Sequence, residues 1–218
     1  MTTFQDLPVE IRGMIYEQAL RDSECFGLDI TPHIDDCRIN FRHYSRKLSG
    51  FCYTNKTECD IALSIFLRNA TFIVCCVHTV MRNLLDSFPA NIAYKAVRNI
   101  EYRHIMAHTV IDYYGAMLYR YVLSRCTGLQ KLTIGFSIRE ITELCSFKPL
   151  PGAEISDNKI IEAIFGCMNL REIKLEVTFH RIFCLDDALK GLREVAVWIK
   201  QEFEKKGKQD VEVKIKAW

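Results

Sequence analysis

A short apolar pattern recurs three times from the middle of this 218-residue chain onward. Each copy has the form L-x-x-L-x-L, with aliphatic or aromatic substitutes, at residues 97–102, 129–134 and 170–175. The second and third copies share their lead-in as well, because Cys126 and Cys167 each stand three residues before the first leucine. Side chains alternate between the two faces of a β-strand, so the last two apolar positions of each copy predict a strand with one buried face.

Helical patterns separate these segments, over residues 109–125, 157–167 and 186–206. Residues 51–67 and 78–88 also have helical patterns, and the β-branched stretch between them predicts a buried strand. A strand, a helix and a second strand of the same kind predict parallel pairing with right-handed crossovers. We therefore expect an α/β fold with parallel strands, adjacent in chain order, at about residues 71–77, 97–103, 129–135, 170–177 and 210–216.

The recurrence of one strand–helix unit also indicates a repeat protein. A unit that cannot bury its own apolar face is typical of solenoids, and leucine-rich repeats carry the L-x-x-L-x-L core on a strand. The units here are longer than the usual roughly 20–29 residues, so the sequence predicts a short, irregular leucine-rich-repeat-like solenoid of parallel strands and helices. The alternative is an ordinary layered α/β domain with coincidental apolar spacing, and the duplicated cysteine lead-in favours the solenoid.

The N-terminal part of the chain follows another pattern. Ile11, Met14, Ile15 and Ala19 are spaced as on one face of a helix, which predicts a helix over about residues 9–20. Residues 21–50 show no clear period and predict a long loop with at most a short hairpin. We therefore divide the chain into residues 1–50, a helix with a long loop, and residues 51–218, a repeat-like α/β domain, within one continuous fold.

The same N-terminal segment carries a motif. Residues 4–16 read F-x-x-L-P-x-E-I-R-x-x-I-Y, which resembles the opening of the F-box-like domain of filamentous fungi. Stretches at residues 69–74 and 97–100 resemble later parts of that family, so the resemblance covers about residues 4–104. It implies an F-box-like helix that binds a Skp-type adaptor of cullin ubiquitin ligases, followed by a region that captures the substrate protein. The residues that the resemblance places at the adaptor contact are Leu7, Pro8, Ile11 and Ile15.

The alternative for this helix is purely structural. A solenoid must cover the apolar face of its terminal repeat. In that case the apolar residues of the helix pack onto the first repeat as an end cap and bind no partner.

The predicted strands also offer a polar face. Residues that alternate with the buried positions point away from the core, and in neighbouring strands they form rows of mixed charge. Such a face suits a polar protein or peptide partner, whereas the alternative is that neighbouring charges only neutralise one another. The candidate partner-binding residues are Glu101, Arg103, Lys131, Glu172, Lys174 and Glu176.

Composition argues against several other kinds of function. A net charge of +2 is too balanced for an electrostatic nucleic-acid binder, and no apolar run reaches the roughly 18 residues of a membrane helix. The N-terminus has neither the basic start nor the apolar core of a signal peptide. We therefore expect a cytoplasmic or nuclear protein that binds neither nucleic acid nor membrane and whose ten cysteines stay reduced.

The motifs give no support for catalysis. There is no Gly-rich phosphate loop, no G-x-S-x-G and no H-E-x-x-H, and the spacing of Cys25, His33, Cys37 and His43 matches no common zinc pattern. We predict no catalytic residue, no metal and no cofactor. The sequence thus indicates a protein-interaction module, interpreted as the substrate-recognition subunit of a cullin-type ubiquitin ligase. The alternatives are a structural scaffold unconnected to ubiquitin and a small enzyme that uses an unrecognised cysteine.

Overall fold

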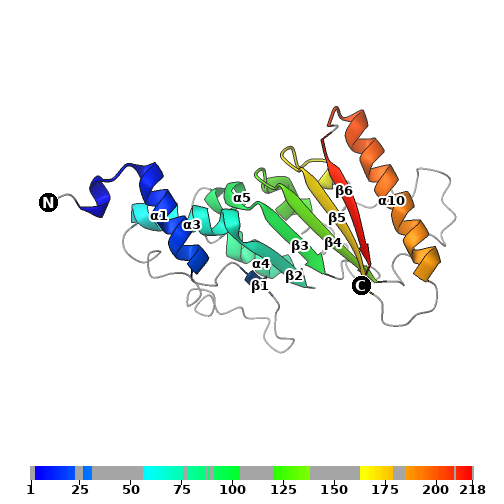
Figure 1. The fold of residues 1–218 in the computed structure, drawn as a ribbon, viewed down its shortest axis with the longest axis horizontal. Helices are drawn as coiled ribbons and strands as arrows, with labels where there is room; N and C mark the ends of the chain where they lie inside the picture. Colours follow the sequence, from blue (N-terminus) through cyan, green and yellow to red (C-terminus); the bar gives the residue numbers. More distant parts are fainter. Residues whose placement is uncertain are drawn as a thin grey trace.

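The computed structural model describes residues 3–22, 27–30, 56–75, 78–86, 88, 91–103, 120–137, 163–178, 185–208 and 210–217. Within these residues six strands form one sheet, in which spatial neighbours follow chain order and every neighbouring pair is parallel. The strands are β1 (Gly27–Ile30), β2 (Thr71–Cys75), β3 (Asn99–Arg103), β4 (Lys131–Ser137), β5 (Glu172–Thr178) and β6 (Glu212–Ala217). In Figure 1 the strands lie side by side along the length of the molecule.

Helical segments precede or connect the strands. They are η1 (Phe4–Asp6), α1 (Val9–Asp22), α3 (Lys56–Asn69), α4 (His78–Asp86), α5 (Ile92–Ala96) and α10 (Leu185–Lys205). Residues 120–125 and 163–164 are helical as well, and they lead into β4 and β5. Figure 1 shows α1 at one end of the sheet and α10 at the other. None of the helices in the described part of the chain is long and apolar enough to cross a membrane.

The prediction of an α/β fold with parallel strands in chain order is confirmed. Each of the five predicted strands begins within two residues of its expected position. The prediction of a loop over residues 21–50 is wrong for Gly27–Ile30, which form β1 and pair with β2 in a register that aligns residue 28 with residue 72. A strand of four residues is too short to show a period, and its pairing with β2 defines it.

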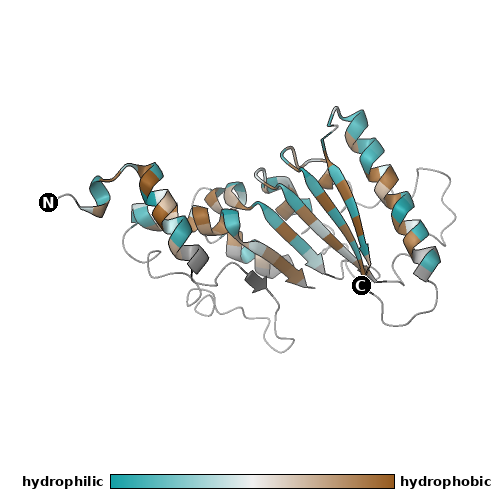
Figure 2. Ribbon diagram, in the orientation of Figure 1, coloured by the Kyte–Doolittle hydropathy of each residue, from teal (hydrophilic) through white to brown (hydrophobic). Residues whose placement is uncertain are grey.

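Buried side chains form continuous rows across the sheet. One row contains Phe72, Ile100, Leu132 and Ile173, aligned residue by residue in the strand register, and it ends at Val213. The first four are at most 1% exposed, whereas Val213 on the last strand is only partly buried. Figure 2 shows the matching alternation of hydrophobic and hydrophilic residues along the strands. A second buried row contains Val74, Tyr102, Ile134 and Leu175.

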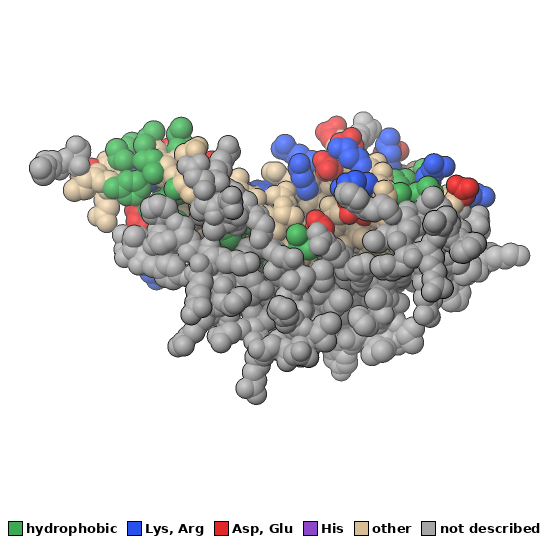
Figure 3. All heavy atoms as spheres, turned by 60° about the horizontal axis from the view of Figure 1, so that its bottom comes forward, with side chains coloured by type: hydrophobic (Ala, Val, Ile, Leu, Met, Phe, Trp, Pro, Cys, Tyr) green, Lys and Arg blue, Asp and Glu red, His purple; other side chains and the backbone are tan. Residues whose placement is uncertain are grey.

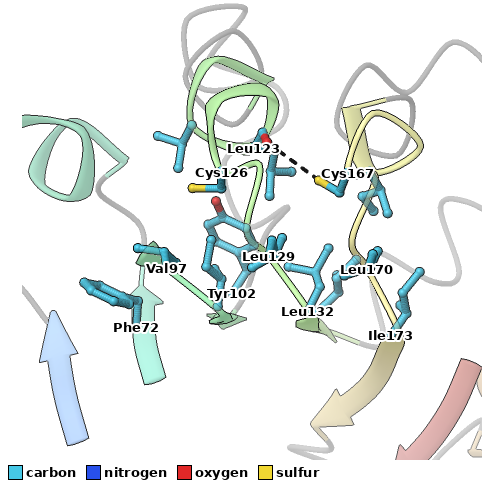
Figure 4. Close-up of a cluster of buried hydrophobic side chains, with 14 of the residues drawn as sticks. Phe72, Val97, Tyr102, Leu123, Cys126, Leu129, Leu132, Cys167, Leu170 and Ile173 are labelled. Carbon is cyan, nitrogen blue, oxygen red and sulfur yellow. Dashed lines mark hydrogen bonds between the residues drawn. The ribbon is translucent and has the colours of Figure 1, made fainter. Parts of the chain in front are cut away.

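The duplicated cysteine lead-in produces two similar turns before β4 and β5. Cys126 and Cys167 are buried where their helical segments end, and Leu129 and Leu170 follow as buried side chains. The Cys167 Sγ lies 3.6 Å from the carbonyl oxygen of Leu123, so the second turn packs on the helical segment before the first (Figure 4). Burial raises the pKa of Cys126 and raises that of Cys167 to about 11. Both cysteines therefore serve as small apolar core side chains.

Gly128 lies where two consecutive turns approach each other closely. The Arg98 Nη1 donates to the carbonyl oxygen of Lys95 at 2.8 Å and to that of Gly128 at 2.6 Å. A Cβ atom at position 128 would overlap both the guanidinium group and the Lys95 carbonyl oxygen. Position 128 requires glycine because of this close approach. A left-handed backbone is not the reason, because among the described glycines it is Gly207 that has a positive φ.

Side-chain donors join the later turns in the same way. The Asn169 Nδ2 donates to the Thr127 carbonyl oxygen at 2.6 Å. The Lys208 Nζ donates to the Cys167 carbonyl oxygen at 2.7 Å. Each of these bonds links one unit to the next and satisfies a carbonyl group at a helix end, where backbone acceptors lack helical partners.

Candidate functional site

Five large apolar side chains at the N-terminal end are exposed, and we call them the N-terminal apolar surface: Phe4, Val9, Ile11, Met14 and Ile15. Met14 is 66% exposed, and Ile11 and Ile15 are each 42% exposed. In Figure 3 hydrophobic side chains gather at this end of the molecule, away from the charged side chains over the sheet. Apolar side chains gathered on one exposed segment are typical of a surface that binds another protein.

All four predicted adaptor-contact residues lie in this N-terminal segment. Ile11 and Ile15 belong to the N-terminal apolar surface, Pro8 is exposed and Leu7 is half-buried. Leu7 and Pro8 form the connection between η1 and α1. The fold thus leaves Pro8, Ile11 and Ile15 accessible to a second molecule.

A tight turn fixes the chain ahead of α1. The Asp6 carboxylate accepts hydrogen bonds from the backbone N–H of Thr3 at 2.6 Å and from the Thr3 hydroxyl at 2.9 Å. These bonds, the backbone one first, lower the pKa of Asp6. The turn brings the Phe4 ring edge-on against the Tyr16 ring, with 5.5 Å between the centroids. Because Tyr16 is buried, this contact holds the exposed η1 segment against α1.

One buried carboxylate anchors α1 to α3. Glu58 on α3 is 3% exposed, and no other charged residue in the described part of the chain is buried. The Tyr16 hydroxyl donates to Glu58 Oε2 at 2.6 Å, and Arg12 forms a hydrogen-bonded ion pair with Glu58 Oε1. A buried charge is tolerated when it is paired and hydrogen-bonded, and Arg12 and Tyr16 meet both conditions. This anchor fixes which face of α1 packs on α3.

Five of the six predicted partner-binding residues lie on the polar face of the sheet. The strand register aligns Lys131 with Glu172, and Glu101 with Lys174 through Thr133 on β4. Arg103 is in β3, and its side chain lies outside the described residues. We call the following set the outer charged face: Glu101, Lys131, Glu172, Lys174, Glu176, Glu212 and Lys214.

Lysine and glutamate side chains of the outer charged face form ion pairs within and between strands, although the register aligns Glu172 with Glu212 and Lys174 with Lys214. The Lys214 Nζ lies 2.9 Å from Glu212 Oε2 and 3.4 Å from Glu172 Oε2, and Lys174 pairs with Glu176 along β5. The hydrogen bond to Glu212, and after it the one to Glu172, raises the pKa of Lys214. These side chains are exposed or only partly buried, so their ion pairs are screened by water and contribute little to stability. The face can therefore exchange its ion pairs for those of a partner at little cost to the fold.

A separate polar cluster joins α4, α5 and the helical segment that ends at residue 125. Asp86 accepts hydrogen bonds from Tyr94 at 2.8 Å, Arg125 at 3.0 Å and Arg82 at 3.3 Å. Burial alone would raise the pKa of Asp86, but these three bonds lower it. Desolvation first, and then the bond to Asp86, raises the pKa of Tyr94 to about 12. Each of these groups bonds to others of the cluster, which makes it a link between helices.

Metal-ligating side chains do not gather at one point in the described part of the chain. In the described part of the chain, no group of three or more His, Cys, Asp or Glu residues is placed to hold a metal ion. Cys25, His33, Cys37 and His43 lie outside that part. The described thiols of Cys59, Cys126 and Cys167 are free.

The chain has no match among protein-family models, among curated proteins or among solved structures. The F-box-like and leucine-rich-repeat-like features therefore stay resemblances of the sequence. The geometry itself offers two exposed surfaces of different chemistry, one apolar on η1 and α1 and one charged on β3–β6.

Proposed function

We propose that this chain is a protein-interaction subunit that recognises substrates for a cullin-type ubiquitin ligase. In this proposal the N-terminal apolar surface binds a Skp-type adaptor, and the outer charged face binds a polar surface of the substrate protein. The sheet serves as a short leucine-rich-repeat-like solenoid that displays the second surface. Such a subunit acts in the cytoplasm or nucleus and needs no catalytic residue or cofactor of its own, because it only brings substrate and ligase together.

The exposure of Ile11 and Ile15 is the observation that carries this proposal. α1 packs on α3 through Tyr16 and Arg12, yet the two isoleucines stay 42% exposed after that packing. A single exposed aliphatic side chain is ordinary, but a group of them on one segment indicates an interaction site. These are also residues that the F-box resemblance places at the adaptor contact.

A binding experiment with a purified fungal Skp-type adaptor tests the proposal. We expect the double variant Ile11→Asp, Ile15→Asp to lose adaptor binding by more than roughly tenfold, since buried apolar anchors at interfaces often contribute more than about 1 kcal/mol each. The matched control is Val197→Asp on α10, because Val197 is an aliphatic helix residue that is 56% exposed at the far end of the molecule. The control should bind the adaptor like the wild type.

A structural scaffold, with α1 as an end cap, is the second candidate. The Glu58 anchor favours it, because this buried contact fastens α1 to the helix at the end of the sheet. Under this alternative the wild-type chain takes up no adaptor, and the aspartate variant at positions 11 and 15 lowers the unfolding midpoint. Retention of adaptor by that variant at wild-type affinity would equally contradict our proposal.

A further inference from the structure

A groove runs between α1 and α3, beside the residues assigned to the adaptor. Its volume is about 580 Å³, and one residue of α5, Ile92, closes one side. The α1 wall consists of Val9, Glu10, Gly13, Met14 and Glu17. The α3 wall consists of Asp60, Ile61, Ser64, Ile65 and Arg68. Leu7, Pro8, Ile11 and Ile15 do not line this groove, but Val9 and Met14 of the N-terminal apolar surface do, so the two sites overlap in part.

The two walls have the same helical spacing. In each wall the five lining positions follow the order i, i+1, i+4, i+5 and i+8, which is one stripe along two helical turns. At 1.5 Å per residue each stripe is about 12 Å long. A trough of this length between two helices fits about two turns of a third helix, which packs by placing its side chains into the gap.

The floor of the groove is apolar. Val9 and Met14 are exposed, Ile61 and Ile65 are half-buried, and Gly13 contributes no side chain. A Cβ atom on Gly13 would come no closer than 3.6 Å to its nearest neighbour, Ile65 Cδ1. The glycine thus leaves open space on the floor that an apolar side chain from another molecule can occupy.

The rim of the groove is acidic. Among the described residues that line it, Glu10 and Glu17 on α1 and Asp60 on α3 are acidic, and Arg68 at the end of α3 is basic. A segment that enters the groove therefore meets a net negative charge. Charge complementarity at the rim of an interface selects the partner more than it sets the affinity.

We propose that the α1–α3 groove binds a basic amphipathic helix of a partner protein. The partner helix places apolar side chains at i and i+4 over Gly13 and between Met14 and Ile65. Its Lys and Arg residues flank these positions and face Glu10 and Asp60. The site does not use the adaptor-contact residues Leu7, Pro8, Ile11 and Ile15, although it shares Val9 and Met14 with the N-terminal apolar surface.

The test uses the full-length chain and a fluorescein-labelled peptide of alanine and lysine with leucines at i and i+4. We expect saturable binding, seen as a rise in fluorescence anisotropy, that weakens as salt is added. A peptide with glutamate in place of lysine should bind more than roughly tenfold more weakly. A peptide with serine in place of leucine should lose binding to a similar degree, since the apolar floor then has no occupant.

Substitutions in the groove are the decisive part of this binding test. Gly13→Met should abolish peptide binding, because the new side chain fills the floor. Gly13→Ala is its matched control: it should bind the peptide and unfold at a higher temperature, since alanine favours a helix interior over glycine. The double variant Glu10→Lys, Asp60→Lys should reverse the preference and bind the glutamate peptide. The variant Ile11→Asp, Ile15→Asp should bind the lysine peptide like the wild type, whatever its effect on the adaptor.

Three results would overturn the proposal. One is equal binding of the lysine peptide by the wild type and by a folded Gly13→Met variant. A second is equal binding of the lysine and glutamate peptides by the wild type. The third concerns the chain's own basic stretch, residues 38–47. If only a variant with Arg38, Arg42 and Arg46 replaced by serine takes up the peptide, the groove serves that stretch and no partner.

Discussion

Replacing Gly128 by alanine tests whether the turns between strands depend on close approach of the backbone. The added methyl group does not fit while the Lys95 carbonyl and the Arg98 guanidinium keep their places. The turn must shift, and the shift breaks the two hydrogen bonds that Arg98 donates to the carbonyl oxygens of Lys95 and Gly128.

The size of the effect follows from those two bonds. A hydrogen bond with a charged donor contributes about 1.5–3 kcal/mol when buried, and partial exposure of this site reduces it to about 1 kcal/mol each. Displacement of the turn adds further loss of packing at the buried Leu129. We expect Gly128→Ala to lower the free energy of unfolding by about 2–4 kcal/mol. For a chain of this size that corresponds to a fall in the unfolding midpoint of roughly 4–16 °C.

Urea unfolding followed by circular dichroism measures this difference. The control is Asn169→Ala, at the corresponding position of the next turn, where only the bond to the Thr127 carbonyl is lost. That variant should lose about 0.5–1.5 kcal/mol. In the double variant Arg98→Ala, Gly128→Ala the cost should be less than the sum of the two single costs, because the side-chain overlap is gone. A Gly128→Ala cost below about 0.5 kcal/mol, the range of ordinary surface changes, would refute the close-approach argument.

Four further predictions concern the core, the anchor and the cysteines. Ile173→Ala should lower the free energy of unfolding in urea by about 2–5 kcal/mol, because Ile173 is fully buried. Lys174→Glu should lower it by less than about 1 kcal/mol and should weaken the binding of a partner that uses the outer charged face. Equal costs of the two substitutions would contradict the assignment of the two faces. Tyr16→Phe should cost about 1–2 kcal/mol through loss of the bond to the Glu58 carboxylate, and no measurable change in unfolding would show that this bond does not anchor α1. At pH 8 iodoacetamide should leave Cys126 and Cys167 unmodified in the folded chain, as peptide mass mapping can show, because both are buried with raised pKa values. The folded chain holds the Cys167 proton more tightly than the unfolded chain, so the stability that this group contributes is complete below about pH 9 and is lost as the pH rises through about 11. Cys167→Ala should therefore make the urea midpoint fall less steeply between about pH 9 and pH 11.

The sheet could be predicted from the sequence because two independent sequence patterns identify the same strands. Alternating apolar residues identify strands, and the cysteine lead-in aligns one unit with the next. Together they predict that Ile100, Leu132 and Ile173 share one buried row, as the register shows. The same alternation predicts which face of the sheet carries the charges, so the placement of Lys131 and Glu172 follows directly.

Features that depend on contacts distant in sequence left no local pattern. Glu58 reads as an ordinary surface residue of an amphipathic helix, yet it is buried because Arg12 and Tyr16, 46 and 42 residues earlier, reach it. β1 likewise depends on pairing with β2. The groove between α1 and α3 was not predicted either, since it exists only once those two helices are packed side by side.

Strand order gives the molecule a directional pattern of stability. In the described part of the chain each strand bonds to the strands before and after it in the sequence, so the central strands are held from both sides and the last one from one side. β3 and β4 have a neighbour on both sides, whereas β6 has one and carries the partly buried Val213 and the exposed Ile215. Amide hydrogen exchange should therefore be slowest in β3 and β4 and become faster toward β6. A pulling force on the C-terminus should correspondingly detach the strands one after another, starting with β6.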